Sequence, residues 1–295
     1  MDRTRFRTVW ISDTHLGSSS VQADELALFL KHIACDTLYL VGDIVDMWRL
    51  KQRWRWPSSH NVVVRRILKH SSRGTRVVYI PGNHDDAARH YVGFELGGIE
   101  IALSAAHRTA DGRTLLISHG DQYDLVVTHH RMLSALGAIA YDALLGANRG
   151  WNAARRLAGL PHHSLSQTIK QKVKSACTFI SNFEHEVAAE ANRGGFDGVV
   201  CGHIHKADIR QSIGGSAVAY YNCGDWVESC TALVEHDDGR LEIIDGRAFN
   251  AATRLVAATL ADPDPGDDWP EVRMPFPLPS LHGAADADRM RRVGR

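Results

Sequence analysis

Apolar residues in the first third of the chain form short continuous runs separated by segments of helical periodicity. Residues 8–12 (TVWIS), 37–43 (TLYLVGD) and 76–81 (RVVYIP) are typical of buried strands. In residues 22–33, by contrast, apolar positions recur at the three- and four-residue spacing of a helix, and residues 61–72 continue that pattern. Strands that alternate with helices predict a mostly parallel sheet with both faces covered. We therefore expect an α/β fold.

The pattern changes after residue 120. Residues 114–120 (TLLISHG) and 197–203 (DGVVCGH) are two more strand-like runs, and the helical pattern between them predicts a helical cap insertion at about 122–196. Beyond residue 207, short alternating runs joined by Gly-Gly and Asp-Gly turns predict antiparallel strands. Residues 249–295 contain six of the nine prolines, which predicts a poorly ordered tail. Residues 1–248 are then expected to form the folded domain.

Polar side chains follow five of the predicted strands. An Asp after a strand can simply cap a helix, and a single His can simply be hydrogen-bonded. Five such strand ends in a parallel sheet, however, lie along one edge, where α/β proteins place their sites. The side chains concerned are Asp13 and His15, Asp43, Asn83 with His84 and Asp85, His119 with Asp121, and His203 with His205.

The types of side chain at these strand ends indicate a metal centre. Carboxylate, imidazole and amide oxygen together suit Mn, Fe or Zn better than Ca, and the absence of thiolates disfavours a structural zinc site. Seven donors exceed what one ion needs, so two ions sharing a bridging carboxylate are the simplest interpretation. The donors are Asp13, His15, Asp43, Asn83, His119, His203 and His205.

Charge is balanced overall but unevenly distributed. The formal net charge is zero, which argues against a bulk nucleic-acid binder, yet residues 47–84 contain nine Lys and Arg and no acid. Residues 143–183 likewise contain six basic residues and no acid. Residues 46–61 combine three of the seven Trp with four of the basic residues. Such surfaces suit a phosphorylated amphiphile at a membrane interface. Nucleic-acid binding, or Trp packing beneath solvated charges, are the alternatives.

Five scattered cysteines, an odd number without a CxxC pair, favour reduced thiols in a cytosolic protein. The first residues lead into a predicted strand without the apolar stretch of a signal peptide. No run approaches the roughly 18 apolar residues of a spanning helix. We expect a cytoplasmic protein, with transient contact at the inner membrane surface as a further expectation.

The motifs Asp-x-His, Gly-Asp, Gly-Asn-His-Asp, His-Gly-Asp and Gly-His-x-His occur in this order over residues 8–246 and resemble those of the calcineurin-like metallophosphoesterases. The resemblance implies a four-layer α/β/β/α sandwich with two divalent ions, expected to be Mn²⁺, with Fe, Zn or Mg as alternatives. It further implies that His84 stands beside the scissile phosphate and that Asp85 orients it. The implied ligands are Asp13, His15, Asp43 and His205 for one ion, and Asp43, Asn83, His119 and His203 for the other.

The helical insertion is similar to that of the UDP-2,3-diacylglucosamine pyrophosphatases of lipid A synthesis. Those enzymes commonly carry Arg where this chain has His84, so the resemblance is to a paralogous branch. It implies hydrolysis by metal-activated hydroxide of a glycolipid pyrophosphate, or of another phospholipid, sugar phosphate or nucleotide. A nuclease, a cyclic-nucleotide phosphodiesterase and a non-catalytic scaffold are rival interpretations, and the complete ligand set argues against the scaffold. Expected substrate contacts are Trp48, Arg49, Lys170, Lys172 and Lys174.

Overall fold

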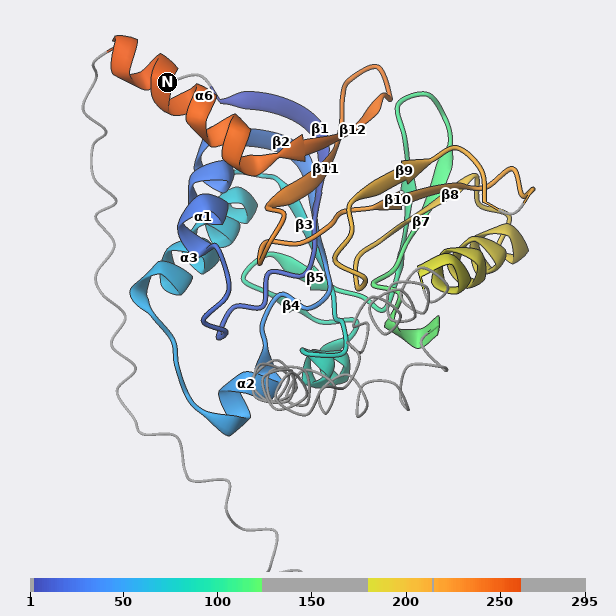
Figure 1. Ribbon diagram of the computed structural model, residues 1–295, viewed down its shortest axis with the longest axis horizontal. Helices are drawn as coiled ribbons and strands as arrows, with labels where there is room; N and C mark the ends of the chain where they lie inside the picture. The colour runs from blue at the N-terminus through green and yellow to red at the C-terminus, as the bar shows by residue number, and fades with distance from the viewer. Residues whose placement is uncertain (1–2, 124–179, 214, 261–295) are drawn as a thin grey trace, which may run out of the picture. The chain divides into compact units, whose positions relative to one another are not determined.

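A computed structural model describes residues 3–123, 180–213 and 215–260, and contains two β-sheets (Figure 1). The first has the order β12-β11-β1-β2-β3-β5-β4 and the second the order β6-β7-β8-β10-β9. The strands of the first sheet are β1 (Thr4–Ile11), β2 (Ile33–Val41), β3 (Arg76–Ile80), β4 (Glu95–Leu96), β5 (Ile99–Ile101), β11 (Thr231–Glu235) and β12 (Leu241–Asp245). Those of the second are β6 (Ala105–Arg108), β7 (Thr114–Ile117), β8 (Gly198–Cys201), β9 (Asp208–Arg210) and β10 (Ala219–Asn222).

Strands that carry the predicted site are paired in parallel. β1, β2 and β3 are parallel neighbours in the first sheet, as are β7 and β8 in the second. The antiparallel pairing expected after residue 207 holds for β9, β11 and β12 but is wrong for one side of β10. β10 pairs in parallel with β8, with Tyr221 opposite Val200. All four residues of β10 are buried, which fits its position between β8 and β9.

The two sheets pack face to face through apolar side chains of both. Trp10, Tyr39 and Val78 from the first sheet share a buried cluster with Leu115 and Tyr221 from the second. The Trp10 and Tyr39 rings are stacked with their centroids 5.8 Å apart. A sandwich of this kind holds its strand ends at fixed positions because its core is densely packed.

Helices cover the outer faces of both sheets. On the first sheet lie α1 (Ala23–His32), α3 (Ser58–Ser72) and α6 (Gly246–Leu260), and Phe29 of α1 and Val63 of α3 join its buried cluster. A helix of residues 180–193 packs Phe183 and Val187 against the second sheet. The predicted α/β/β/α layering is confirmed. The shorter helices are α2 (Met47–Gln52), η1 (Asp86–Tyr91) and η2 (Asp121–Tyr123).

Both predicted boundaries differ from the observed elements. The boundary expected at residue 248 falls inside α6, where buried Asn250 donates hydrogen bonds to the backbone oxygen and the carboxylate of Glu25 (2.9 and 2.7 Å). Residues 180–193, expected in the cap, belong instead to the sandwich because their apolar face covers the second sheet. The remainder of the cap and the tail from residue 261 lie outside the described residues.

Internal contacts group the described residues up to Ala258 into one compact unit. None of the helices in the described parts of the chain is both long and apolar enough to cross a lipid bilayer.

Candidate metal centre

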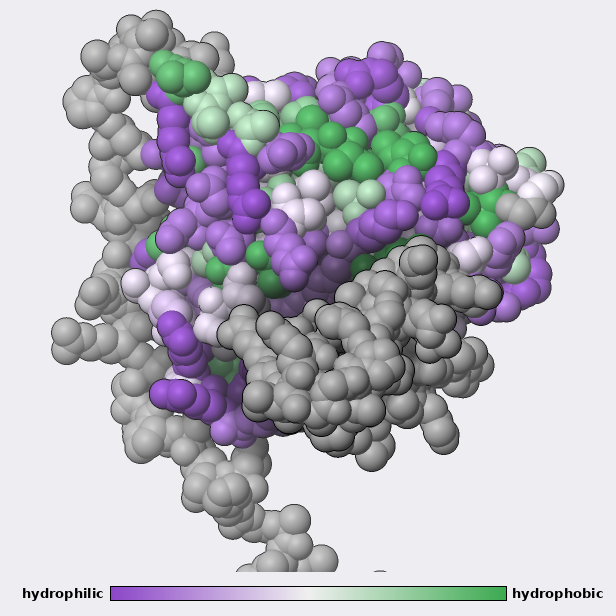
Figure 2. Space-filling view, in the orientation of Figure 1, coloured by the Kyte–Doolittle hydropathy of each residue, from purple (hydrophilic) through white to green (hydrophobic). Residues whose placement is uncertain are grey.

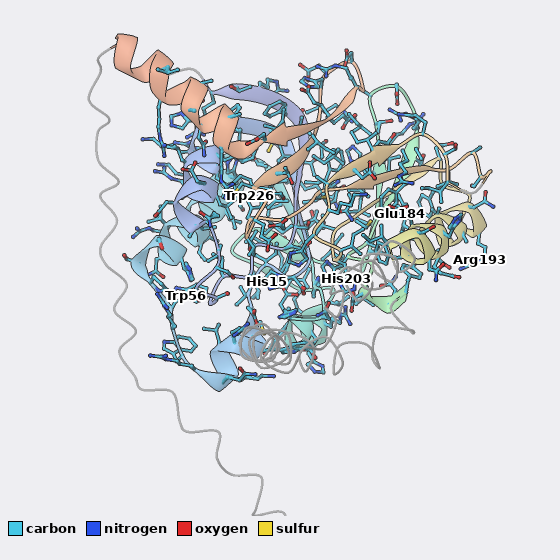
Figure 3. All side chains as sticks on the ribbon, viewed as in Figure 1. His15, Trp56, Glu184, Arg193, His203 and Trp226 are labelled. Carbon is cyan, nitrogen blue, oxygen red and sulfur yellow. The ribbon has the colours of Figure 1, made fainter. Side chains whose placement is uncertain are left out.

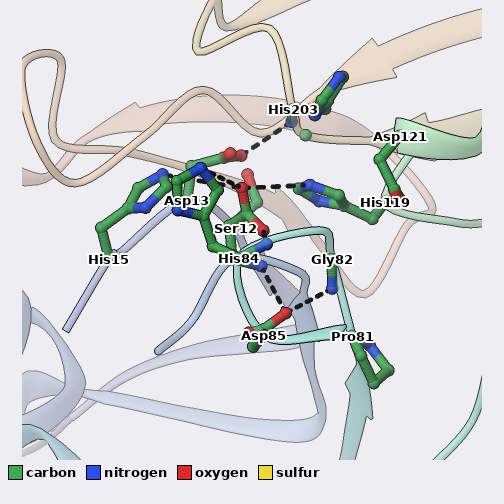
Figure 4. Close-up of polar contacts among 12 residues, drawn as sticks. Ser12, Asp13, His15, Pro81, Gly82, His84, Asp85, His119, Asp121 and His203 are labelled. Atoms are coloured by element: carbon green, nitrogen blue, oxygen red, sulfur yellow. Dashed lines mark hydrogen bonds and ion pairs between the residues drawn. The ribbon is translucent and has the colours of Figure 1, made fainter. Parts of the chain in front are cut away.

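The five polar strand ends come from two sheets. Asp13, Asp43 and Asn83 follow β1, β2 and β3 of the first sheet, whereas His119 and His203 follow β7 and β8 of the second. The prediction that all five lie on the edge of one sheet is therefore wrong. The carboxyl ends of the parallel strands in both sheets face a common region, where side chains from the two sheets come together (Figures 3 and 4).

Six of the seven predicted ligands form two compact groups. In the first, His205 Nε2 lies 3.3 Å from Asp13 Oδ1 and 3.3 Å from His15 Nε2. The second group contains Asp43, His119 and His203, with Asp43 Oδ2 3.5 Å from His119 Nε2. The same Asp43 oxygen lies 3.8 Å from His15 Nε2, between the two groups. Two ions that share Asp43 stay a prediction to which this arrangement is well suited.

The seventh predicted ligand, Asn83, lies in the loop after β3. Its neighbour His84 donates its backbone N–H to Asp43 Oδ1 at 2.7 Å. The amide is therefore carried by a loop that is bonded directly to the carboxylate between the two groups. Its half-buried position is compatible with ligation.

The protonation pattern of His119 fits a metal ligand. Its Nδ1 donates to the backbone oxygen of Val41 at 2.9 Å, which turns the Nε2 lone pair toward Asp43. Within the described residues, this buried Nε2 and the buried Oδ1 of Asp13 make no hydrogen bond. Burial lowers the pKa of His119, but the Asp43 charge outweighs it and raises the pKa to about 10. His119 Nε2, which faces Asp43, can hold either a proton or a metal ion. Because both compete for the same lone pair, a divalent ion would displace the proton.

The backbone at the ligands adopts an unusual conformation. Five of the six non-glycine residues with positive φ in the described ranges are predicted ligands. Their φ values lie between 48° and 71°, in the left-handed region. That conformation costs about 1–2 kcal/mol per residue and persists only where surrounding contacts impose it. The five are Asp13, His15, Asp43, His203 and His205.

Glycines in the motifs make room for the ligands. A Cβ on Gly42 would lie 2.2 Å from His119 Nδ1, and one on Gly82 would lie 2.4 Å from Asp43 Oδ1. A Cβ on Gly202 would lie 2.4 Å from Asp13 Oδ2. Each distance is far inside van der Waals contact, so only glycine lets the backbone come this close. The glycines of Gly-Asp, Gly-Asn-His-Asp and Gly-His-x-His are therefore steric requirements of the site.

Asp85 makes its hydrogen bonds to the loops and to Tyr79. It is fully buried, and its carboxylate accepts backbone N–H groups of Gly82 (2.5 Å) and Ile44 (2.7 Å) and the Tyr79 hydroxyl (2.5 Å). Burial, reinforced by the charge of Asp43, raises the pKa of Asp85. These bonds tie the loop after β2 to the loop after β3. Asp85 is thus a structural link beneath the site.

The carboxylate closest to the His84 ring is that of Asp46. Its Oδ1 lies 3.1 Å from His84 Nδ1 and its Oδ2 lies 3.5 Å from His15 Nδ1. Burial raises the pKa of Asp46, but the two histidines and the Arg49 N–H outweigh it and hold the pKa well below its usual range. By its 3.1 Å distance Asp46 is the stronger candidate to orient His84, and the orienting role of Asp85 stays a prediction. Asp46 is not among the residues predicted from the sequence, although its three-residue spacing from Asp43 is a usable signal.

His84 lies between the two groups of predicted ligands and α2. Its Nε2 is 4.0 Å from Asp43 Oδ2, and its ring packs on Trp48 with a centroid distance of 4.4 Å. Trp48 and Arg49, two of the predicted substrate contacts, are exposed on α2 beside this ring. The other predicted contacts, Lys170, Lys172 and Lys174, lie outside the described residues.

Asp121 of the His-Gly-Asp motif has a different partner. Both of its carboxylate oxygens accept from Arg89 of η1, at 2.8 and 2.7 Å. This ion pair holds the segment that follows His84 against the one that follows His119. Asp121 is therefore a support of the site.

Comparison with known proteins gives one family match and several distant structures. A family model described as calcineurin-like phosphoesterase matches residues 6–207. A predicted phosphoesterase from Streptococcus pneumoniae is 11% identical over 82% of this chain and 90% of its own, with a TM-score of 0.36. Vacuolar Protein Sorting 29 from Cryptosporidium parvum is 10% identical over 80% and 94%, also at 0.36. A Thermus thermophilus protein is 12% identical over 82% and 100%, at 0.38.

Proposed function

This chain belongs to the calcineurin-like phosphoesterase family, and we propose that it cleaves the pyrophosphate of a UDP-2,3-diacylglucosamine-type glycolipid with two Mn²⁺ ions as cofactors. Family membership makes it a phosphoester hydrolase, and the grouped Asp and His side chains are its candidate metal ligands. The choice of substrate class is carried by the exposed Trp48–Arg49 surface beside His84.

This surface suits an amphiphilic anion. The Trp48 ring has 36% of its surface exposed and packs on His84 with its other part. Arg49 is exposed on the same helical turn. A substrate held by its phosphate at the metal ligands would extend over an aromatic ring and a guanidinium group. Planar or apolar parts of the substrate would pack on the Trp48 ring, and a second phosphate would pair with the Arg49 guanidinium.

The chain's own residues complete the chemistry. Divalent cations, when bound, neutralise phosphate charge and make hydroxide available near neutral pH. His84, oriented by Asp46, is in position to donate a proton to the leaving oxygen or to stabilise charge on the phosphoryl group. Asp43, at the centre of the ligands, holds the two halves of the site together.

His84 also favours a second candidate, a phosphodiesterase or phosphatase acting on another phospholipid, sugar phosphate or nucleotide. Imidazole can donate a proton near neutral pH, whereas arginine stays charged and cannot. The presence of His where the resembling pyrophosphatases commonly carry Arg therefore suits an ester whose leaving group needs protonation. Either substrate would be met at the inner membrane surface if it is a lipid.

A substrate panel tests the proposal. Purified protein with Mn²⁺ is given UDP-2,3-diacylglucosamine, bis-p-nitrophenyl phosphate or a cyclic nucleotide, with the Asp43→Asn variant as the control. UMP release that is lost in the variant would support the glycolipid assignment. Turnover of only the generic diester would reject that substrate and retain the second candidate. Parallel assays with Fe, Zn and Mg, together with metal analysis of the protein, identify the ions and their number.

A further inference from the structure

The end of α2 and the residues directly after it expose basic side chains around a tryptophan. We call residues 51–55, the last two of α2 and the three that follow, the Trp54 loop. Lys51, Arg53, Trp54 and Arg55 are all exposed, and 58% of the Trp54 surface is accessible. None of the three basic side chains forms an ion pair with an acid in the part of the chain that the structure describes. The loop thus presents unneutralised positive charge and one large aromatic ring.

The base of the loop is tied to the segment that follows the predicted ligand His15. Trp56, directly after the loop, donates its indole N–H to Asn61 Oδ1 at 2.8 Å and packs edge-on against His60. Buried His60 accepts the backbone N–H of Gly17 at 3.1 Å, two residues beyond His15. One tryptophan therefore fastens the loop to the segment that carries Asp13 and His15.

We propose that the Trp54 loop docks the protein on the surface of an anionic phospholipid bilayer. Tryptophan favours the headgroup level, where its ring is buried and its N–H stays hydrated. Basic side chains near an anionic surface add about 1 kcal/mol each. The stretch from Met47 to His84 contains no acid, so the basic residues of the loop are not balanced within it. In Figure 2 the corner occupied by α2, at lower left, is strongly hydrophilic.

Lipid fits this loop better than single-stranded nucleic acid does. Nucleic-acid grooves combine positive charge with a series of aromatic platforms for successive bases. Here a single strongly exposed ring projects from a five-residue loop among charges, and the next tryptophan, Trp56, is engaged with His60. The geometry matches an interfacial anchor. Docking goes beyond the proposed hydrolysis, because binding to a lipid surface needs neither substrate nor turnover.

Vesicle flotation tests the docking directly. Wild type and variants of the full chain are mixed with vesicles of phosphatidylcholine alone or with phosphatidylglycerol, at low and high salt. A thermal melt checks that each variant is folded. The loop variant and its control each lose two exposed arginines and one exposed aromatic ring; they are Arg53→Gln/Trp54→Ala/Arg55→Gln and Arg73→Gln/Phe94→Ala/Arg108→Gln.

Wild type and control are expected to float with anionic vesicles in a salt-sensitive manner and to stay unbound with neutral ones. The loop variant is expected to bind about 25-fold more weakly from the two lost charges, at about fivefold each, with a further loss from Trp54. Equal binding by the loop variant and wild type would overturn the proposal. The proposal would also be overturned if the wild-type protein did not bind anionic vesicles, or if it bound an oligonucleotide through these residues instead. Hydrolysis assays on soluble esters report on the proposed function separately.

Discussion

Replacement of Asp85 by alanine should destabilise the fold, although the residue lies within the Gly-Asn-His-Asp motif. The carboxylate accepts short hydrogen bonds from the buried backbone N–H groups of Gly82 (2.5 Å) and Ile44 (2.7 Å). An alanine leaves both donors without a partner, at about 1–3 kcal/mol each. The sum of about 2–6 kcal/mol is a large part of the roughly 5–15 kcal/mol by which domains of this kind are stable.

Urea unfolding of the metal-free proteins in EDTA gives this free energy directly. Asp46→Ala is the matched control, because it removes a carboxylate from the same site. Its loss takes away the side-chain cap of α2, an acceptor for the Arg49 N–H at 2.9 Å, which is worth about 1 kcal/mol. Asp85→Ala should therefore shift the unfolding midpoint several times further than Asp46→Ala.

An Asp85→Ala protein with wild-type stability and strongly reduced turnover would contradict the structural role of Asp85. That result would mean that Asp85 acts on His84, as the motif alone suggested, and that its backbone hydrogen bonds contribute little. A loss of stability in Asp85→Ala, with the main catalytic loss in Asp46 variants, would establish the division of roles drawn from the contacts.

Asp46→Asn should lower kcat about 100-fold and keep the wild-type melting temperature, because the substitution mis-orients His84, the proposed general acid. Steady-state kinetics across pH measure kcat, and an unchanged kcat would contradict this role of Asp46. Gly82→Ala should reduce bound metal, because its Cβ meets Asp43. Metal analysis decides, with Gly74→Ala as the control for backbone strain alone, because Gly74 has open space but a φ of +89°. EDTA should abolish turnover and Mn²⁺ restore it, whereas EDTA-resistant activity would exclude a metal requirement. Burial raises the pKa of Glu235, but hydrogen bonds from His107 and Ala110 hold it below its ordinary value of 4.5. Its stabilisation is therefore complete above that value and lost as pH falls below it; melting temperatures from pH 5 to about pH 3 should fall less in Glu235→Gln than in wild type.

Much of the site could be predicted because its signal is local. A buried strand followed by an acid or a histidine is visible in a few residues, as at Asp13, Asp43 and His119. Spacing alone could not show that the strands belong to two sheets, because pairing is a property of distant segments. The parallel pairing of β10 with β8 illustrates this, since the turns around β10 indicated antiparallel hairpins. Short strands such as β4 and β5 are missed because two or three residues carry no periodicity.

The different contacts of Asp46 and Asp85 have a similar cause. Asp85 is adjacent to His84 in sequence, but neighbouring residues in a tight loop direct their side chains differently, and Asp85 turns inward to backbone donors. Asp46 begins a helix, where sequence reasoning assigns an aspartate to capping. The structure shows that it does both, capping α2 and lying 3.1 Å from His84 Nδ1. Only the fold of the loop after β2 distinguishes the two carboxylates.

The left-handed backbone conformation of five predicted ligand residues shows why the motifs combine glycine with charged residues. Asp13 donates its backbone N–H to the Gly42 oxygen at 3.0 Å, and His15 donates to the Asp43 oxygen at 2.9 Å. These bonds join the loops after β1 and β2 while both loops carry positive φ at their ligands. A cost of about 1–2 kcal/mol at each of five residues must be offset by such cross-links and by the packed sandwich beneath them. The backbone strain is therefore concentrated at the predicted metal ligands, where charged side chains lie close together. The neighbouring glycines supply the space that lets the loops approach one another.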